Sequence, residues 1–181
     1  MKKLPPNFSI EKYGIFVRLV NESDAPFILR LRTNTKLARY IHSTDNDIQK
    51  QIEWIRSYKE RERDGKDYYF IYFQSGIPIG LNRIYNIEEY SATGGSWLCE
   101  PGLDVEKVIS TLFIMRNILF ETLGKLKDKF DVRKDNVQVL RTHQMMGAKL
   151  VGESMLDLYL ELDKRVYLKK RDYLLDLLNI K

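Results

Sequence analysis

The chain has 181 residues, with 30 Lys and Arg against 25 Asp and Glu, a formal net charge of +5 and 44% apolar residues. This length and balance fit one globular domain over residues 1–181 and exclude a disordered chain. Positive and negative residues are interspersed, so the excess of positive charge predicts no nucleic-acid partner.

No apolar run approaches the roughly 20 residues of a membrane span, and the start of the chain lacks the apolar region of a signal peptide. The chain has one cysteine, Cys99, which excludes an internal disulfide. We therefore expect a cytoplasmic protein without a membrane partner.

The first half of the chain predicts a strand, two helices and three antiparallel strands. Residues 1–13 are expected to form a loosely ordered lead-in before a strand over residues 15–20. A first helix follows the cap at residues 21–24, with Pro26 in its first turn, and a second runs from about residue 47 to 64 with apolar residues at helical spacing. The three strands are expected over residues 68–73, 77–85 and 96–99.

The second half predicts alternating helices and strands. A long helix runs from Asp104, its expected N-cap, to Gly124, and a strand covers residues 129–133. A helix over residues 136–146 stops at Gly147, strands follow over residues 149–153 and 155–162, and a basic helix covers residues 164–178. This order indicates an α/β fold with a mixed, mostly antiparallel sheet of six to seven strands and helices on both faces.

Residues 132–153 form the most specific pattern in the chain. A strand leads into Asn136, a helix follows, and the helix stops at Gly147 before the small residue Ala148. This pattern, together with the element order over residues 15–162, resembles the GNAT acyltransferase superfamily. The resemblance implies a splayed pair of parallel strands that receives the pantetheine arm of acetyl-CoA, the acyl donor.

The resemblance also implies a set of cofactor-binding residues. The N-terminus of the long helix would hold the CoA pyrophosphate, although Glu106-Lys107-Val108 stands where the family usually has Gly-x-Gly. Side chains there crowd a phosphate, and Lys107 with two hydroxyl groups is expected to compensate. The residues assigned to the cofactor are Leu98, Cys99, Lys107, Val108, Ile109, Ser110, Thr111, Asn136 and Val139.

Two catalytic candidates follow from the same resemblance. His143 occupies the position where many relatives have a tyrosine that protonates the departing CoA thiolate, and histidine suits proton transfer near neutral pH. The alternative is a packing histidine. Glu100 is the candidate base that deprotonates the amine, against the alternative of an exposed loop carboxylate, and a backbone N–H around residues 98–100 is expected to polarise the acyl carbonyl.

The acceptor pocket is expected between the first two helices and the third strand. Residues 29–41 resemble the corresponding segment of GNAT members that acetylate nucleotide-linked amino sugars, such as the enzyme of the pseudaminic acid pathway. His42 has no identifiable partner and is predicted to be structural. The assigned substrate residues are Arg32, Asn34, Asn82, Arg83 and Tyr85.

The sequence therefore predicts an acetyl-CoA-dependent N-acetyltransferase that acts on a small amine, with a nucleotide-linked amino sugar as one such amine. It is expected to work as a monomer or a homodimer without a metal. Two alternatives stay open at this stage: an acetyltransferase of protein or peptide N-termini, and a GNAT-fold binding protein that has lost catalysis through its altered phosphate loop.

Overall fold

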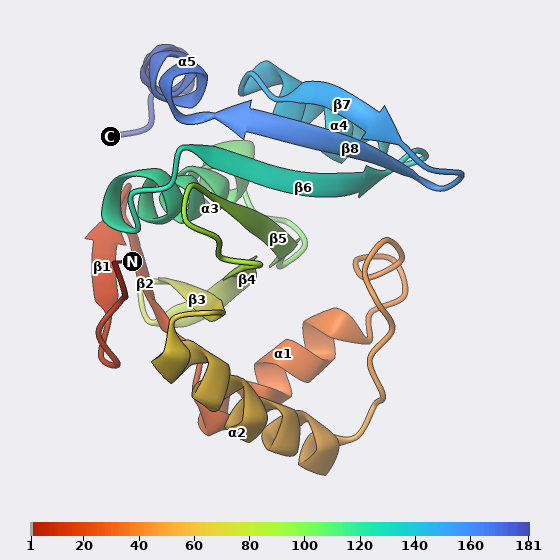
Figure 1. Cartoon of the computed structure of the whole chain (residues 1–181). Coiled ribbons are helices and arrows are strands. Elements are labelled where there is room, and N and C mark those ends of the chain that lie inside the picture. Colours follow the sequence, from red (N-terminus) through yellow and green to blue (C-terminus); the bar gives the residue numbers. More distant parts are fainter. Residues whose placement is uncertain (1) are drawn as a thin grey trace.

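An open sheet of eight strands, in the order β1-β2-β3-β4-β5-β6-β8-β7, forms the centre of the computed structural model, which describes residues 2–181 (Figure 1). Neighbouring strands pair antiparallel except β5 and β6. The strands are β1 Ser9–Lys12, β2 Ile15–Leu19, β3 Tyr68–Gln74, β4 Ile77–Tyr85, β5 Ser91–Cys99, β6 Lys127–Arg133, β7 Lys149–Glu153 and β8 Asp157–Asp163. The helices are α1 Ala25–Arg32, α2 Ile48–Asp64, α3 Val105–Asn117, α4 Val137–Met145 and α5 Lys164–Leu177, with short helical turns at Glu22–Asp24 and Ile118–Thr122.

Helices cover both faces of the sheet, as predicted. The α1 and α2 helices pack on one face, and α3 with residues of α4 and α5 packs on the other (Figure 1). The continuous apolar run of β3 follows from this position, because Phe70 and Tyr72 join the α3 cluster while Tyr69 and Ile71 join the α1–α2 cluster.

The sequence underestimates the strands. Residues 9–12, which the sequence places in a lead-in, form β1 and pair with β2 at the edge of the sheet. Their mostly polar residues give no strand signal. The β5 strand begins at Ser91 rather than near residue 96. Gly94 and Gly95 lie inside this strand at points of close packing: a Cβ at Gly94 would lie 2.5 Å from Met115 Cε, and one at Gly95 would lie 2.9 Å from the Tyr85 hydroxyl.

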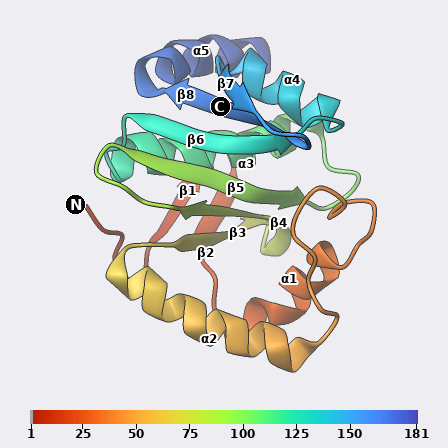
Figure 2. The same ribbon diagram turned by 45° about the vertical axis from the view of Figure 1, so that its right-hand side comes forward.

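The parallel strands β5 and β6 pair over two residue pairs and then diverge (Figure 2). The pairs are Ser91 with Lys127 and Ala92 with Asp128. Beyond them, β5 keeps its pairing with β4, and β6 keeps its pairing with β8 along its whole length. The splayed parallel pair is thus confirmed. Beyond these two pairs, the facing edges of β5 and β6 do not pair with each other.

A buried ion pair sits where the two strands part. The Asp128 carboxylate accepts a hydrogen bond from the Gly94 N–H at 2.8 Å and one from Arg116 Nε at 3.1 Å. The side chains of Arg116 and Asp128 are both 0% exposed. Asp128 therefore links β6 to β5 beyond the last residue pair, with its charge balanced from α3.

Asp128→Ala is expected to lower the free energy of unfolding by about 3–5 kcal/mol, because it leaves the buried Arg116 guanidinium without its anion. Urea unfolding followed by circular dichroism measures this change. Glu153→Gln, which breaks the exposed Lys134–Glu153 pair, is the control and should cost less than about 1 kcal/mol. Similar losses for the two variants would contradict the proposed importance of the pair.

Candidate functional site

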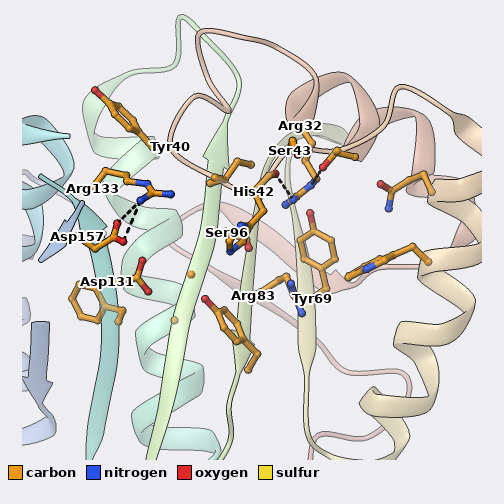
Figure 3. Close-up of a pocket in the computed structure, with 18 of the residues that line it drawn as sticks. Arg32, Tyr40, His42, Ser43, Tyr69, Arg83, Ser96, Asp131, Arg133 and Asp157 are labelled. Carbon is orange, nitrogen blue, oxygen red and sulfur yellow. Dashed lines mark hydrogen bonds and ion pairs between the residues drawn. The ribbon is translucent and has the colours of Figure 1, made fainter. Parts of the chain in front are cut away.

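A cavity of about 830 Å³ lies beneath the segment that joins α1 to α2 and reaches the point where β5 and β6 diverge. Arg32 of α1 and Tyr69 of β3 lie on one side (Figure 3). Trp54 of α2 also lines the cavity. The opposite side is formed by β5 and β6 residues, among them Ser96 and Asp131. The cavity therefore extends from the sheet face covered by α1 and α2 to the unpaired edges of β5 and β6.

The β5 strand is distorted along this cavity. Its register against β4 shifts between Leu81 and Arg83, and Ser96 has a φ of 51°. Past this bulge, the Glu100 N–H bonds to the Ile79 carbonyl on β4. Because backbone groups alternate in direction along a strand, the N–H groups of Trp97 and Cys99 point toward the gap. Of the predicted backbone donors around residues 98–100, Cys99 is the one that faces the gap.

The walls of the cavity combine cationic and aromatic side chains. The Arg83 guanidinium lies 5.2 Å from the Trp54 ring and 5.0 Å from the Tyr85 ring. Arg32 donates to Thr44 Oγ1 at 2.7 Å and to the His42 carbonyl at 3.1 Å, so it fixes the connecting segment above the cavity (Figure 3).

Tyr69 also lines this wall, and Asp67 pairs with one of its arginines. The Tyr69 hydroxyl is buried without a hydrogen-bond partner among residues 2–181, and burial raises the pKa of Tyr69. Asp67 pairs with Arg83 and lies 3.2 Å from Arg61 Nε, so its carboxylate is committed to these two cations. Tyr69 is thus a buried polar group of the cavity wall that lies close to the charge of Arg32.

His143 lies between the two diverging strands, on the face covered by α3 and α4. Its ring centroid is 4.5 Å from that of Phe130 on β6 and 6.3 Å from that of Trp97 on β5. Arg116 Nη2 donates to Nδ1 at 3.1 Å, which leaves the ring hydrogen of a neutral imidazole on Nε2. Burial, followed by the Arg116 charge, holds the pKa of His143 well below its ordinary value.

The two candidates at the end of β5 have other partners. Glu100 forms an ion pair with Arg30 of α1 and does not line the cavity. Cys99 is half-buried, its Sγ lies 3.6 Å from Thr111 Oγ1, and burial raises the pKa of the thiol to about 11. Cys99 is therefore a protonated packing residue at neutral pH and not an activated nucleophile.

The predicted cofactor residues of α3 are half-buried at Lys107 and Val108 and buried at Ile109, Ser110 and Thr111. Glu106 is exposed at the first turn, and Lys107 Nζ lies 3.5 Å from the Tyr13 carbonyl. The hydroxyl groups of Ser110 and Thr111 are buried and donate to carbonyls of their own helix at 2.6 and 2.8 Å. These hydroxyl groups face the protein interior, as does Ile109, whereas Val108 is half-buried.

Two expected N-caps are not formed by side chains. Asp104 and Asn136 occupy the cap positions of α3 and α4, but neither side chain makes a capping hydrogen bond. Neither side chain is therefore used to cap its helix. Asn136 is half-buried and Val139, one turn later, packs at the edge of the core.

Of the five predicted substrate residues, Arg32, Arg83 and Tyr85 line the cavity, and two residues do not. Asn82 is fully buried, and strand alternation places it with Ile84 on the α3 face. Asn34 accepts hydrogen bonds from the N–H groups of Lys36 and Leu37 at 3.1 and 3.2 Å, so it stabilises the connecting segment. Asn34 and Asn82 therefore do not line this cavity.

The cavity also contains residues that the sequence reasoning missed. His42, which was taken as structural, lies in the lining with Tyr69 and Asp131. The alternation Phe130-Asp131-Val132, with buried neighbours on either side, was a signal that Asp131 faces away from the α3 core. Nothing local in the sequence places His42, because its position depends on the path of a segment without regular structure.

Comparisons with known proteins identify similar structures. A structure described as apo FdhC, a nucleotide-linked sugar GNAT, has 36% sequence identity and a TM-score of 0.83, with 92% of this chain and 96% of that chain covered. The N-acetyltransferase PseH from Campylobacter jejuni has 21% identity and a TM-score of 0.65, covering 83% of this chain and 99% of that one. The ribosomal-protein-S5-alanine acetyltransferase from Vibrio fischeri has 14% identity and a TM-score of 0.74, covering 87% and 97%. No family model and no curated protein matches the chain, and no helix within residues 2–181 has the length and apolar character to cross a membrane.

The buried His143 predicts a specific pH dependence of stability. The folded chain keeps the imidazole neutral, whereas the unfolded chain binds a proton below about pH 6.5, so wild-type stability falls as the pH drops through this range. His143→Gln removes this contribution. The unfolding free energy of the wild type minus that of the variant should therefore decrease by up to about 1.4 kcal/mol per pH unit below about pH 6.5.

Urea unfolding at several pH values between about 7.5 and 5 measures this difference. Gln144→Ala, an exposed neighbour on α4, serves as the control and should give a difference that does not vary with pH. The same flat result for His143→Gln would show that the imidazole is not held neutral in the folded state.

Proposed function

The chain belongs to the GNAT acetyltransferases, and from this we propose that it transfers the acetyl group of acetyl-CoA to the amine of a nucleotide-linked amino sugar. The family rests on the 36% identity with the nucleotide-linked sugar GNAT FdhC over 92% of the chain. The nature of the acceptor is our inference, supported by that relative and by the side chains of the cavity.

The observation that carries the proposal is the opening between β5 and β6 beyond Ala92 and Asp128. The two strand edges there have no partner in each other, and the N–H groups of Trp97 and Cys99 point into the gap. An extended chain with amide groups, such as pantetheine, fits such an edge because it can complete the missing hydrogen bonds. Acetyl-CoA supplies the acetyl group as a thioester.

His143 is proposed to face the leaving thiol from the α4 side of this gap. It is flanked by Trp97 of β5 and Phe130 of β6, one from each diverging strand. With Nδ1 occupied by Arg116, its Nε2–H is the available donor. In this proposal His143 acts as a neutral hydrogen-bond donor to developing negative charge, as a tyrosine hydroxyl would, and not as an imidazolium.

The acceptor is proposed to enter from the opposite face, through the cavity. Arg32 and Arg83 offer guanidinium groups that suit a diphosphate, and Trp54 and Tyr85 offer aromatic surfaces that suit a nucleotide base or a sugar ring. Tyr69 adds a hydroxyl without a partner. This mixture of cations and aromatic rings supports a nucleotide-linked acceptor over a simple polyamine, which has no anionic group for the arginines.

An acceptor panel tests the proposal. The purified chain is incubated with acetyl-CoA and with UDP-glucosamine, nucleotide sugars with a C3 or C4 amine, the hydroxyl counterpart of each, spermidine, and a peptide that begins with alanine. Release of free thiol, followed with a chromogenic disulfide, should depend on a nucleotide-linked amino sugar. Preferential release with the peptide would favour the N-terminal acetyltransferase instead.

Binding of acetyl-CoA alone separates an enzyme from an inactive binding protein that lacks the donor. A ligand of the folded state raises the melting temperature, with about 2.7 kcal/mol of stabilisation at a concentration 100 times its Kd. The proposed activity would be refuted if none of the acceptors in the panel caused thiol release and millimolar acetyl-CoA left the melting temperature unchanged.

A second prediction concerns the phosphate end of the donor. If the start of α3 holds the pyrophosphate, Glu106→Gln should tighten acetyl-CoA binding about two- to fivefold, because it removes a like charge from the helix N-terminus. Isothermal titration calorimetry measures this change. Glu121→Gln, the same charge change at the far end of the same helical segment, should leave the affinity unaltered, and an unchanged affinity for Glu106→Gln would place the pyrophosphate elsewhere.

A further inference from the structure

The carboxylates that line the cavity differ in how their charges are balanced. Asp45 pairs with Lys50 at 2.7 Å, and Asp157 pairs with Arg133 at 3.1 Å. Asp131 has no hydrogen-bond or ion-pair partner among residues 2–181. It is therefore the cavity-lining carboxylate that is free to receive a cation from a ligand.

Asp131 stands at the mouth of the strand gap. It lies on β6 three residues after Asp128, the last β6 residue that pairs with β5, and continuation of that parallel register puts it opposite Gly95. Phe130 and Val132, its neighbours in the chain, are buried on the other face. Figure 3 shows the Asp131 side chain directed from β6 into the cavity.

A second polar group shares this position. The Tyr85 hydroxyl lies against Gly95, 2.9 Å from where a Cβ would be, so the absence of a side chain at Gly95 makes room for it. Burial, followed by the negative charge of Asp131, raises the pKa of Tyr85. Asp131 from β6 and Tyr85 from β4 thus converge in front of the same β5 residue.

We propose that Asp131 is the binding and proton-accepting group for a primary ammonium on the acceptor, a role that rests on the proposed acetyl transfer. An unpaired carboxylate beside the opening attracts the protonated amine and orients its nitrogen toward the gap. Tyr85 supplies a neutral hydrogen bond beside it. This assignment replaces Glu100, whose carboxylate is occupied by Arg30 outside the cavity.

The proton balance follows directly. The Asp131 carboxylate takes one proton from the ammonium and later releases it to water, which frees the nitrogen lone pair. The nitrogen forms its bond to the acetyl carbon as the carbon–sulfur bond breaks, and the second proton lost by nitrogen ends on the thiol. The sum is an ammonium and a thioester converted to an amide, a thiol and one proton.

The test compares Asp131→Asn, Asp131→Glu and wild type on the panel amine that the wild type acetylates fastest. Asp131→Asn should lower kcat/KM for that amine by about 100-fold or more, while the KM for acetyl-CoA stays unchanged. Asp131→Glu keeps the charge and should recover part of the rate. Asp176→Asn, an exposed carboxylate on α5, is the control for the loss of one negative charge.

Binding provides an independent measurement. For UDP-glucosamine against UDP-glucose, and for the corresponding C3- and C4-amino pairs, calorimetry should show that the wild type prefers the amine in at least one pair and that Asp131→Asn abolishes this preference. Because the Asp131 side chain is exposed and bonds nothing, the melting temperature of the variant should match that of the wild type.

The two proposals fail in different ways. A wild type that acetylates none of the panel amines refutes the proposed function itself. An active wild type with an equally active Asp131→Asn variant, or with no preference for the amine in any pair, overturns the role of Asp131 and leaves acetyl transfer standing.

Discussion

The whole arrangement depends on how the chain stabilises two parallel strands at the point where they separate. A strand that leaves its neighbour exposes backbone N–H groups that need new partners. The Asp128 carboxylate supplies the partner for the Gly94 N–H, and Arg116 neutralises the buried charge. The remaining Arg116 nitrogens bond Nδ1 of His143 and the sulfur of Met146. One fully buried guanidinium therefore connects both strands to α3 and α4.

This network makes the opening a defined feature and not a fault in the sheet. Removing two charges from water is costly, and such a pair is retained without penalty only when its hydrogen-bonding groups are satisfied. Here Asp128 bonds a backbone N–H as well as Arg116, and Arg116 bonds three different groups. The same contacts orient His143, so the stability of the opening and the protonation state of the residue beside it have one physical origin.

Much of the fold could be predicted from local pattern. The apolar period of α2 and the left-handed glycines Gly65 and Gly147 mark their elements closely, because each signal lies within a short stretch of chain. The strand β1 and the first half of β5, residues 91–95, were not predicted because their residues are polar or small. β5 is a strand because it pairs with β4, and its glycines admit the close approach of Met115 and Tyr85, contacts that come from distant parts of the sequence.

The site was predictable to a smaller extent, for a related reason. The sequence identifies polar residues in a strand, but only the sheet order reveals which face of the strand meets a cavity. Asn82 is therefore buried in the interior, whereas its neighbour Arg83 lines the cavity. The sequence did not indicate Asp131, because its place beside the gap results from the divergence of β5 from β6 beyond Asp128. His143, which the family motif indicated, lies between the diverging strands. Its neutral state depends on its burial and then on the charge of Arg116, which no motif indicated.

The altered start of α3 has a consequence for how a donor would be held under the proposed function. A helix N-terminus and a single carboxylate beside it contribute terms of similar size and opposite sign, each about 0.3–1 kcal/mol, so Glu106 nearly cancels the attraction of the helix for a pyrophosphate. Each hydrogen bond along the free strand edges contributes about 0.5–1.5 kcal/mol. Donor affinity would then come mainly from the gap between β5 and β6. The structure built around Asp128 would thus have to supply the binding energy that relatives with a glycine-rich loop obtain partly from their phosphate site.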